Sequence, residues 1–545
     1  MADEIHVPVN PVRVVTATSL FDGHDAAINI MRRILQSQGA ELIHLGHNRS
    51  VDEVVQAAVQ EDASAVAVSS YQGGHIEYFT YLVERLAAQG APHIRVYGGG
   101  GGVIVPTEIE KLATLGVRIF SPEDGARMGL AQMVNTIIAE CDHPPVGEVD
   151  VPALLGGSDR AMAAALSAVE NGADVPGEVA AAAAARQVPV LGITGTGGSG
   201  KSSLTDELLL RLRLDQQDKV RVAVLAVDPN RRRSGGALLG DRIRMNSIDS
   251  PQVYFRSVGT RGASSEVPDC VADMLAVCRA AGADLVLVET PGIGQGDAAV
   301  TELADVALYV MTPEFGAPSQ LEKIDMLDFA DAVAINKFER RGAEDALRDV
   351  RRQMARNTGR FGEDDSMPVF GTIAARFNDD GVTALYQYLR GLLAARGLEV
   401  DEGTLAPVHS STSSEISVLL PAERIRYLAE VAETVRSYHA RTEELAQAVR
   451  VVSHLETAVA ELAAADAETT ELEALLDVAR SRVPAEAAGL LERHAADRER
   501  LSGEDRPARE SLAGTLVSRV ALPRLREPAE LLRWLRAENL PGQFP

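Results

Sequence analysis

Cysteine and aromatic residues are scarce in this sequence. Three cysteines, Cys141, Cys270 and Cys278, occur among 545 residues, and their spacing fits neither a disulfide framework nor a zinc site. Buried thiols in a reducing compartment are therefore the simplest interpretation. Aromatic residues make up 4% of the chain, which disfavours a protein that binds single-stranded nucleic acid by stacking its bases.

Excess positive charge and long apolar runs are also absent. The chain has 53 Lys and Arg against 78 Asp and Glu, and the net charge of −25 disfavours nucleic acids and anionic membranes as partners. No uninterrupted apolar run reaches the ~18 residues of a membrane span, and the N-terminus MADEIHVPVN has no apolar signal-peptide core. We therefore expect a cytoplasmic protein without nucleic acid or membrane partners.

Residues 10–145, the first predicted domain, alternate between buried strands and amphipathic helices. Continuous apolar strands separated by helices are typical of a parallel, doubly wound α/β sheet. Ser50 is expected to cap the helix that begins at Val51. Apolar runs predict strands at 12–18, 41–45, 65–70, 94–102 and 117–120.

A second α/β pattern occupies residues 188–400, after a segment, 146–187, that we interpret as a linker with an Ala-rich helix. Residues 415–545 are dominated by long amphipathic helices rich in Ala, Glu and Arg, which we expect to serve dimerisation or docking. The helical pattern begins at 421, too late for a (β/α)₈ barrel of about 200 residues or more. Predicted strands of the second pattern lie at 188–195, 222–228, 283–289, 306–312, 332–336 and 368–374.

A phosphate-binding motif opens the second pattern. The residues from Gly195 to Ser202, GTGGSGKS, match GxxxxGK[ST] in full, between an apolar strand and a helix. Backbone N–H groups and the helix N-terminus form an anion nest, Lys201 is expected to reach the β- and γ-phosphates, and Ser202 to supply an oxygen to Mg²⁺. The predicted phosphate site comprises Gly195, Gly197, Gly198, Ser199, Gly200, Lys201, Ser202 and Ser203.

Three acids follow strands or lie in a glycine-punctuated loop of the same domain: Asp228, Asp241 and Glu289. Such positions suit a mobile γ-phosphate sensor, and the alternative is a solvated strand end or, for Asp241, pairing with neighbouring arginines. Gln295, in GIGQGD, is a candidate for orienting the attacking water on its location alone.

The sequence Asn336-Lys337-Phe-Glu339 ends a predicted strand and is close to the guanine-specifying pattern NKxD. A carboxylate there accepts from guanine N1 and N2 hydrogens, which adenine does not offer, so GTP is favoured over ATP. After the last strand, the main-chain N–H of Ala374 is expected to support the base.

Three loops at the carboxyl edge of the first sheet carry a further site. Asp22 and His24 follow the first strand, where ligands of doubly wound sheets bind, and Asp22 is placed to hold the imidazole tautomer. A lone loop histidine is usually only exposed to solvent. Here, however, the segments 69–74 and 98–102 bring further glycines to the same edge and leave room for a large, flat ligand.

These loops resemble the DxHxxG…SxL…GG pattern of the cobalamin-binding domain in adenosylcobalamin-dependent mutases. Ala27 and Tyr71 stand where that pattern has Gly and Leu. The resemblance implies that adenosylcobalamin binds here and that its nucleotide tail threads into the domain. The implied cofactor site has His24 as cobalt ligand, Asp22 as its partner, Ser69 and Tyr71 near the tail, and Gly98 and Gly99 as the paired glycines.

The order of the two domains, with stretches such as FDGHDAAINIMRRILQSQG and VDPNRRRSGGALLGDRIRMN, resembles the fused isobutyryl-CoA mutase family. The GTPase also resembles the G-protein chaperones of methylmalonyl-CoA mutase. The resemblance implies a flavodoxin-like cobalamin-binding domain, a P-loop GTPase α/β domain and an α-helical C-terminal linker. It also implies that Mg²⁺ is bound by Ser202, Asp228, Asp241 and Glu289.

Family members continue into a TIM barrel that binds acyl-CoA, and this chain is expected to lack it. We therefore expect the cobalamin- and GTP-binding portion of an acyl-CoA mutase of the isobutyryl-CoA/n-butyryl-CoA type, in which GTP hydrolysis gates cofactor loading and protects the mutase. The partner would be a TIM-barrel chain or missing C-terminal segment, and the assembly a homodimer.

Two alternatives remain open. One is a stand-alone, GTP-dependent chaperone that delivers cobalamin to a separate methylmalonyl-CoA-type mutase. The other is a cobalamin-sensing regulator, which is disfavoured because the acidic C-terminal helices offer no basic face for DNA.

Overall fold

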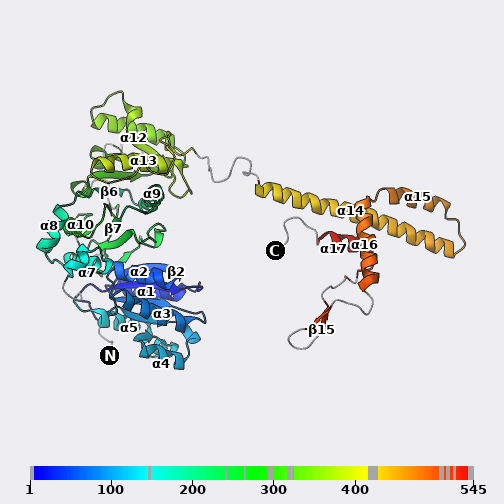
Figure 1. The fold of residues 1–545 in the computed structure, drawn as a ribbon, viewed down its shortest axis with the longest axis horizontal. Coiled ribbons are helices and arrows are strands. Elements are labelled where there is room, and N and C mark those ends of the chain that lie inside the picture. Colours follow the sequence, from blue (N-terminus) through cyan, green and yellow to red (C-terminus); the bar gives the residue numbers. More distant parts are fainter. Residues whose placement is uncertain are drawn as a thin grey trace. The chain divides into compact units, whose positions relative to one another are not determined.

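The computed structural model describes residues 5–144, 149–231, 234–240, 242–262, 265–292, 299–315, 321, 324–414, 427–501, 508–510, 516–518, 523 and 525–537. The chain divides into two compact units, Met1–Ser417 and Val418–Pro545. The first unit holds two large parallel sheets, and the second is mainly helical (Figure 1). Within the described ranges, no helix is long and apolar enough to span a membrane.

The N-terminal sheet has the strand order β5-β4-β3-β1-β2, with all pairs parallel. This is the flavodoxin-like order, so the predicted doubly wound sheet and its five strands are confirmed. The strands carry fully buried side chains because helices cover both faces. They are β1 Arg13–Ser19, β2 Glu41–Arg49, β3 Ala65–Ser69, β4 Arg95–Gly99 and β5 Val117–Ile119.

Five helices and a short 3₁₀ turn surround this sheet. One face packs against α1 and α5, and the other against α2, α3 and α4. The predicted cap at Ser50 is present as a capping box, because Ser50 Oγ accepts from Glu53 N and Glu53 Oε2 accepts from Ser50 N. The elements are α1 Ala26–Ser37, α2 Val51–Gln60, α3 His75–Ala88, η1 Gly101–Val103, α4 Pro106–Thr114 and α5 Pro122–Cys141.

The second sheet, called the central sheet, has the order β13-β12-β11-β6-β10-β7-β9 and is parallel throughout. The six predicted strands are confirmed, but β9 was not predicted, because Arg256 and Ser257 interrupt its apolar run. The strands are β6 Val190–Gly195, β7 Val222–Asp228, β9 Val253–Gly259, β10 Leu285–Glu289, β11 Val306–Met311, β12 Ala332–Asn336 and β13 Val369–Thr372.

Helices α9 and α13 cover one face of the central sheet, and α10 and α12 lie on the other. These helices are α9 Lys201–Asp215, α10 Val271–Ala280, α12 Ala343–Asn357 and α13 Asp380–Ala395. Short 3₁₀ turns connect the rest: η2 Arg242–Arg244, η3 Ala299–Glu302, η4 Pro313–Phe315, η5 Asp325–Asp328 and η6 Asp364–Ser366.

The segment that we interpreted as a linker contributes three helices to the fold: α6 Val151–Leu155, α7 Asp159–Glu170 and α8 Gly177–Ala184. The predicted Ala-rich helix is α8. Side chains such as Leu166, Val169 and Val179 are buried against α10 and the central sheet. Small residues let α7 and α8 each approach α10 closely, so this stretch is packed core as well as connection.

The region after β7, predicted as a mobile loop, contains a short strand that joins the other domain's sheet. Strand β8, Ala237–Leu239, pairs in parallel with residues 41–43 of β2 and becomes the sixth strand of the N-terminal sheet. Ala237 and Leu239 are fully buried there. A three-residue strand is visible only when the edge that it pairs with is known, which is why sequence patterns did not reveal it.

The second unit confirms the predicted helical region. Its apolar centre includes Leu445, Val449, Ala487 and Leu532. A hairpin, β14 Ala508–Glu510 with β15 Leu516–Ser518, was not predicted. The helices are α14 Tyr427–Ala464, α15 Thr470–Ser481, α16 Ala485–Leu501 and α17 Pro528–Ala537.

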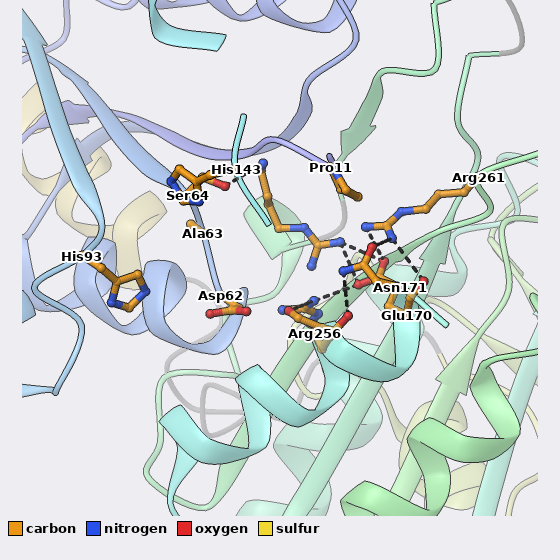
Figure 2. A pocket seen from close by; sticks show the side chains of 12 residues that line it. Pro11, Asp62, Ala63, Ser64, His93, His143, Glu170, Asn171, Arg256 and Arg261 are labelled. Atoms are coloured by element: carbon orange, nitrogen blue, oxygen red, sulfur yellow. Dashed lines mark hydrogen bonds and ion pairs between the residues drawn. The ribbon is translucent and has the colours of Figure 1, made fainter. Parts of the chain in front are cut away.

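Buried ion pairs join the N-terminal and central sheets. Glu170, at the end of α7, accepts from Arg13 of β1 (3.0 Å) and from Arg256 of β9 (2.8 Å), and it pairs with Arg261 (3.2 Å) (Figure 2). Glu41, the first residue of β2, accepts from both Arg13 and Arg261 at 2.8 Å. These contacts tie strands of one sheet to the edge of the other.

A third carboxylate of this interface, Glu61, is fully buried after α2. It accepts from Ser257 N (3.0 Å) and Ser257 Oγ (2.9 Å) in β9, and Arg242 approaches it at 3.6 Å. Arg242 also donates to the side chain of Gln60 (2.8 Å). A backbone N–H and a hydroxyl therefore satisfy a carboxylate that has no access to water, and a guanidinium lies close enough to pair with its charge.

Burial alone raises the pKa of Glu170 and Glu41, but the surrounding guanidiniums, led by Arg13, outweigh it and hold both pKa values below the usual range. A carboxyl with a depressed folded pKa contributes stability that is complete above its unfolded pKa. That contribution is lost as the pH falls through the folded value. The interface should therefore weaken in acid.

Replacing Glu170 by Ala should lower the free energy of unfolding of the first unit by about 3–5 kcal/mol, because three guanidiniums lose a buried partner. Urea unfolding of the full chain, followed by circular dichroism, measures this. Fluorescence of the only tryptophan, Trp534, reports the second unit instead and should not change.

The matched control is Asp52→Ala, which removes the exposed partner of Arg85. It should cost no more than about 1 kcal/mol. If Glu170→Ala lowers the free energy of unfolding by as little as this control, the buried ion pairs have no structural role.

Candidate functional site

The His24 loop, residues 20–25, follows β1 at the carboxyl edge of the N-terminal sheet. Asp22 is 2% exposed, whereas the His24 side chain is 77% exposed. One Asp22 oxygen accepts from His24 N (2.9 Å) and contacts His24 Nδ1 (2.8 Å), and the other accepts from Tyr71 N at 2.5 Å. The loop therefore presents an imidazole whose Nδ1 is engaged and whose Nε2 is left for a ligand.

The ionised state of Asp22 explains how it can hold this imidazole. Burial alone raises its pKa, but the N–H groups of Tyr71 and His24 stabilise the carboxylate, and the net pKa lies below its usual value. A charged carboxylate on Nδ1 favours the N–H at that nitrogen and increases the basicity of Nε2. A carboxylate that holds one ring nitrogen while the other stays exposed is typical of a metal-bound histidine.

An apolar cavity of about 230 Å³ lies beside the loop, between the strand ends and helices α1 and α5. Its walls include Met31, Phe120 and Met133, and Tyr71 lies at it with its ring centroid 5.6 Å from that of His24. Ser69 is part of the lining, and its buried Oγ has no hydrogen-bond partner among the described residues. An apolar ligand with one polar group would fit this lining.

Glycines shape the floor of the cavity. A Cβ on Gly98 would lie 2.5 Å from Ile119 Cδ1, and one on Gly100 would lie 2.0 Å from the carbonyl oxygen of Ser70, so neither position admits a side chain. A Cβ on Gly99 would meet nothing closer than 3.8 Å. The protein's own packing therefore does not require a glycine at position 99, and a side chain there would take up space in the cavity.

The phosphate loop lies between β6 and α9. Lys201 is buried and its Nζ donates to the carbonyl oxygens of Gly195 (3.2 Å) and Thr196 (3.4 Å). Gly200 has φ +89°, and a Cβ there would lie 2.5 Å from Asn336 Nδ2. The sequence GTGGSGKS thus adopts a loop that only glycines at these positions allow.

The rest of the predicted phosphate site surrounds this loop. Gly198 also has a positive φ, of +74°. Ser199 is buried and donates through Oγ to Thr196 O at 2.8 Å. Gly197 is exposed in the loop and Ser203 is exposed in the first turn of α9.

The predicted magnesium ligands come together in part. Ser202 Oγ donates to Glu289 Oε1 (2.7 Å), and Thr205 Oγ1 donates to Glu289 Oε2 (2.8 Å). Asp228, at the end of β7, accepts from Gly240 N at 2.9 Å. The strand order places β7, β10 and β6 next to one another, so these acids share one sheet edge with the phosphate loop.

Asp241 and Gln295, predicted as magnesium ligand and water-orienting residue, lie outside the described residues. In the part of the chain that the structure describes, no group of three or more His, Cys, Asp or Glu side chains is arranged to hold a metal ion. The four-residue magnesium set therefore stays a prediction.

The predicted base-recognition residues also meet the phosphate loop. Asn336 Nδ2 donates to Ser199 O (2.8 Å), and Lys337 Nζ donates to Gly198 O (2.7 Å). The N–H of Ala374, expected to support the base directly, donates instead to Asn336 Oδ1 at 3.0 Å. Ala374 thus orients the amide that the pattern NKxD requires.

Glu339 is exposed beyond the end of β12, where a base edge can reach it. Sequence reasoning missed two residues of the other site, Phe21 and Asn48. Asn48 Oδ1 accepts from Phe21 N at 2.8 Å, and both have positive φ values, 63° for Phe21 and 56° for Asn48. An Asn near the end of a strand was the only available signal, since it tolerates this conformation.

The fold and both sites define a cobalamin-type doubly wound domain joined to a P-loop GTPase. Family models agree: the B12 binding domain matches residues 12–131, and Methylmalonyl Co-A mutase-associated GTPase MeaB matches residues 177–395. The expected classes of both domains are confirmed. Cobalamin, and GTP with Mg²⁺, are the ligands of these two domains.

Relatives align with the whole chain. It is 60% identical, over 100% of its length, to fused isobutyryl-CoA mutase of Nocardia farcinica, and 53% identical, over 99%, to that of Cupriavidus metallidurans. The whole chain is therefore similar to one part of the fused isobutyryl-CoA mutases. It spans about half the length of these curated relatives, 52% and 51%.

Replacing Lys201 by Ala should reduce GTP hydrolysis by about 10²–10³-fold, because a preorganised cation is removed from the developing phosphate charge. Phosphate release by the purified chain measures this. Cobalamin binding without nucleotide should not change, because Lys201 lies in the central sheet's phosphate loop and the His24 loop belongs to the other sheet. Undiminished hydrolysis would place the nucleotide site elsewhere.

Proposed function

We propose that this chain is the cofactor-handling part of an adenosylcobalamin-dependent acyl-CoA mutase that interconverts isobutyryl-CoA and n-butyryl-CoA. It binds the cofactor at the N-terminal sheet and hydrolyses GTP at the central sheet to control cofactor loading. An acyl-CoA-binding barrel, from another chain or a further segment, completes the mutase, and the assembly is a homodimer.

The observation that carries this proposal is the Asp22–His24 pair next to an apolar cavity, within the same compact unit as the phosphate loop. His24 Nε2 binds cobalt, and Asp22 holds the imidazole through Nδ1. The cavity would hold the nucleotide tail of the cofactor, and a polar group of that tail would satisfy Ser69 Oγ. Adenosylcobalamin, when bound, would supply radical chemistry.

Each group of residues in the nucleotide site has its own role in this proposal. Lys201 and the backbone of residues 195–202 bind the phosphates, and Ser202 with Glu289 and Asp228 holds Mg²⁺. Asn336, fixed by Ala374 N, and the exposed Glu339 recognise guanine. Gln295 and Asp241 complete the site as water-orienting residue and metal ligand.

The His24→Ala variant should lose the change in the cobalamin absorption spectrum that accompanies exchange of the lower ligand. Asp22→Ala should weaken cobalamin affinity by about 10–100-fold, because the imidazole loses the partner that orients it. Titration of the purified chain with adenosylcobalamin measures both effects.

His439→Ala, at an exposed histidine of α14, is the matched control and should behave as the wild type. GTP hydrolysis should continue in all three variants. An unaltered cobalamin spectrum in His24→Ala would remove His24 as the cobalt ligand.

Gly99→Val tests the cavity itself. Its Cβ clashes with nothing in the protein, so the fold should persist while the side chain fills space that the ligand needs. Cobalamin affinity should fall by at least about tenfold, the equivalent of 1.4 kcal/mol. Gly102→Val, which lies in η1 outside the cavity lining with nothing within 4 Å of its Cβ, should bind normally. Equal affinities in the two variants would contradict the cavity assignment.

The mutase role is tested by adding the part of the Nocardia farcinica relative that this chain does not match. With adenosylcobalamin and GTP present, the mixture should convert isobutyryl-CoA into n-butyryl-CoA, whereas neither component alone should do so. Conversion only after transfer of cobalamin to a separate methylmalonyl-CoA-type mutase would favour the delivery-chaperone alternative.

A further inference from the structure

We infer that strand β2 couples the nucleotide site to the cobalt-ligand loop, with Asn48 as the positioning residue at its end. This inference rests on the proposed function and adds to it a physical route. The route runs from Asp228 through β8 and β2 to Phe21, and each step is a contact between described residues.

The route begins at the metal-binding edge of the central sheet. Asp228 ends β7, and its Oδ2 accepts from Gly240 N at 2.9 Å. Gly240 directly follows β8. A change in the charge that Asp228 faces, such as loss of a γ-phosphate and its Mg²⁺, therefore acts on the residue that ends β8.

Strand β8 is held tightly against β2 and its neighbours. Its three residues pair in register with Glu41, Leu42 and Ile43. Gly236, just before β8, approaches so closely that a Cβ there would lie 2.1 Å from Gln36 O. A backbone packed this closely shifts together with β2 instead of sliding past it.

A second contact follows β8 along the chain. Ile243 of η2 lies close to Gly46 of β2: a Cβ built on Gly46 would be 3.1 Å from Cδ1 of Ile243. Gly46 has φ +85° and lies at an irregularity in the pairing of β2 with β1. Strand β8 thus contacts the start of β2, and Ile243, which follows β8 along the chain, contacts its middle.

The start of β2 is anchored to the central sheet as well. Glu41 accepts from Arg261, which follows β9, and from Arg13 of β1. Because these charges are buried, separating them is costly, and the strand behaves as a rigid extension of the GTPase.

The other end of β2 reaches the cobalt-ligand loop. Asn48 Oδ1 accepts from Phe21 N at 2.8 Å, immediately before Asp22. Phe21 has φ 63°, a conformation that a bulky residue adopts only when its surroundings impose it. Asn48 imposes it, so displacement of the strand end changes the position of Asp22 and of the imidazole that it holds.

Coupling of this kind is reciprocal and measurable. If the nucleotide changes cobalamin affinity by some factor, cobalamin must change nucleotide affinity by the same factor. The quantity to measure is the ratio of cobalamin dissociation constants in GDP and in a non-hydrolysable GTP analogue. Wild-type chain should show a ratio that departs from one by at least about fivefold.

Asn48→Gly keeps the positive φ but removes the acceptor for Phe21 N. In this variant, the ratio of cobalamin dissociation constants in the two nucleotides should fall to within about twofold of one. GTP hydrolysis should stay at the wild-type rate. Asn48→Asp retains an acceptor and should restore the wild-type ratio. Asn378→Gly, at another exposed Asn with positive φ (52°), is the matched control and should leave the ratio unchanged.

Gly236→Ala tests the other end of the route, because its Cβ forces β8 away from Gln36 O. It should reduce the ratio as Asn48→Gly does. Gly391→Ala, in α13 with nothing within 4 Å of the new Cβ, should not. A merely structural effect would weaken cobalamin binding equally in both nucleotide states and leave the ratio as it is.

The outcomes separate this inference from the proposed function. Failure of the wild-type chain to bind cobalamin or GTP would overturn both. Normal binding of each ligand with a ratio of one in the wild type, or an unchanged ratio in Asn48→Gly and Gly236→Ala, would overturn the coupling alone.

Discussion

The first unit depends on a set of carboxylates and guanidiniums buried where two sheets meet. Glu41 and Glu170 each accept from more than one arginine, so neither half of the interface can withdraw without leaving a charge in an apolar environment. Such a contact is specific in geometry even where its net contribution to stability is modest. It joins the two domains into one compact unit.

Strand β8 forms a second connection between the same domains. A segment that leaves the GTPase after β7 enters the N-terminal sheet as β8 and then returns to the central sheet as β9. Sheet pairing is directional and sensitive to register, so a shift on one side is transmitted instead of being absorbed. The His24 loop and the phosphate loop thus lie at the carboxyl edges of two sheets, and β8 connects these sheets because it pairs in one and is joined along the chain to strands of the other. This connection is a physical basis for control of one ligand by the other.

The two binding sites themselves follow a common design, in which a polar side chain is held by backbone N–H donors. Asp22 is kept ionised by Tyr71 N and His24 N, and it orients an imidazole that is otherwise exposed. In the other site, Asn336 is oriented by Ala374 N and secures the phosphate loop through Ser199 O. In both sites, backbone N–H groups fix one side chain, and that side chain positions a further group: Asp22 holds the His24 imidazole, and Asn336 holds the phosphate loop.

Local patterns in the sequence determined much of this protein: the strands of both sheets apart from β8 and β9, the phosphate loop and the Asp22–His24 pair. Apolar periodicity and glycine spacing are properties of neighbouring residues, so a single chain of letters displays them. Only the tertiary structure decided that Arg256 and Ser257 lie in a strand, that residues 151–184 pack as core, that β8 extends the other domain's sheet, and that Asn48 holds Phe21. Each of these depends on partners far away in the chain, such as Glu170 for Arg256 and Glu41 for Ala237, and a buried charge or a three-residue strand has no meaning until that partner is in place.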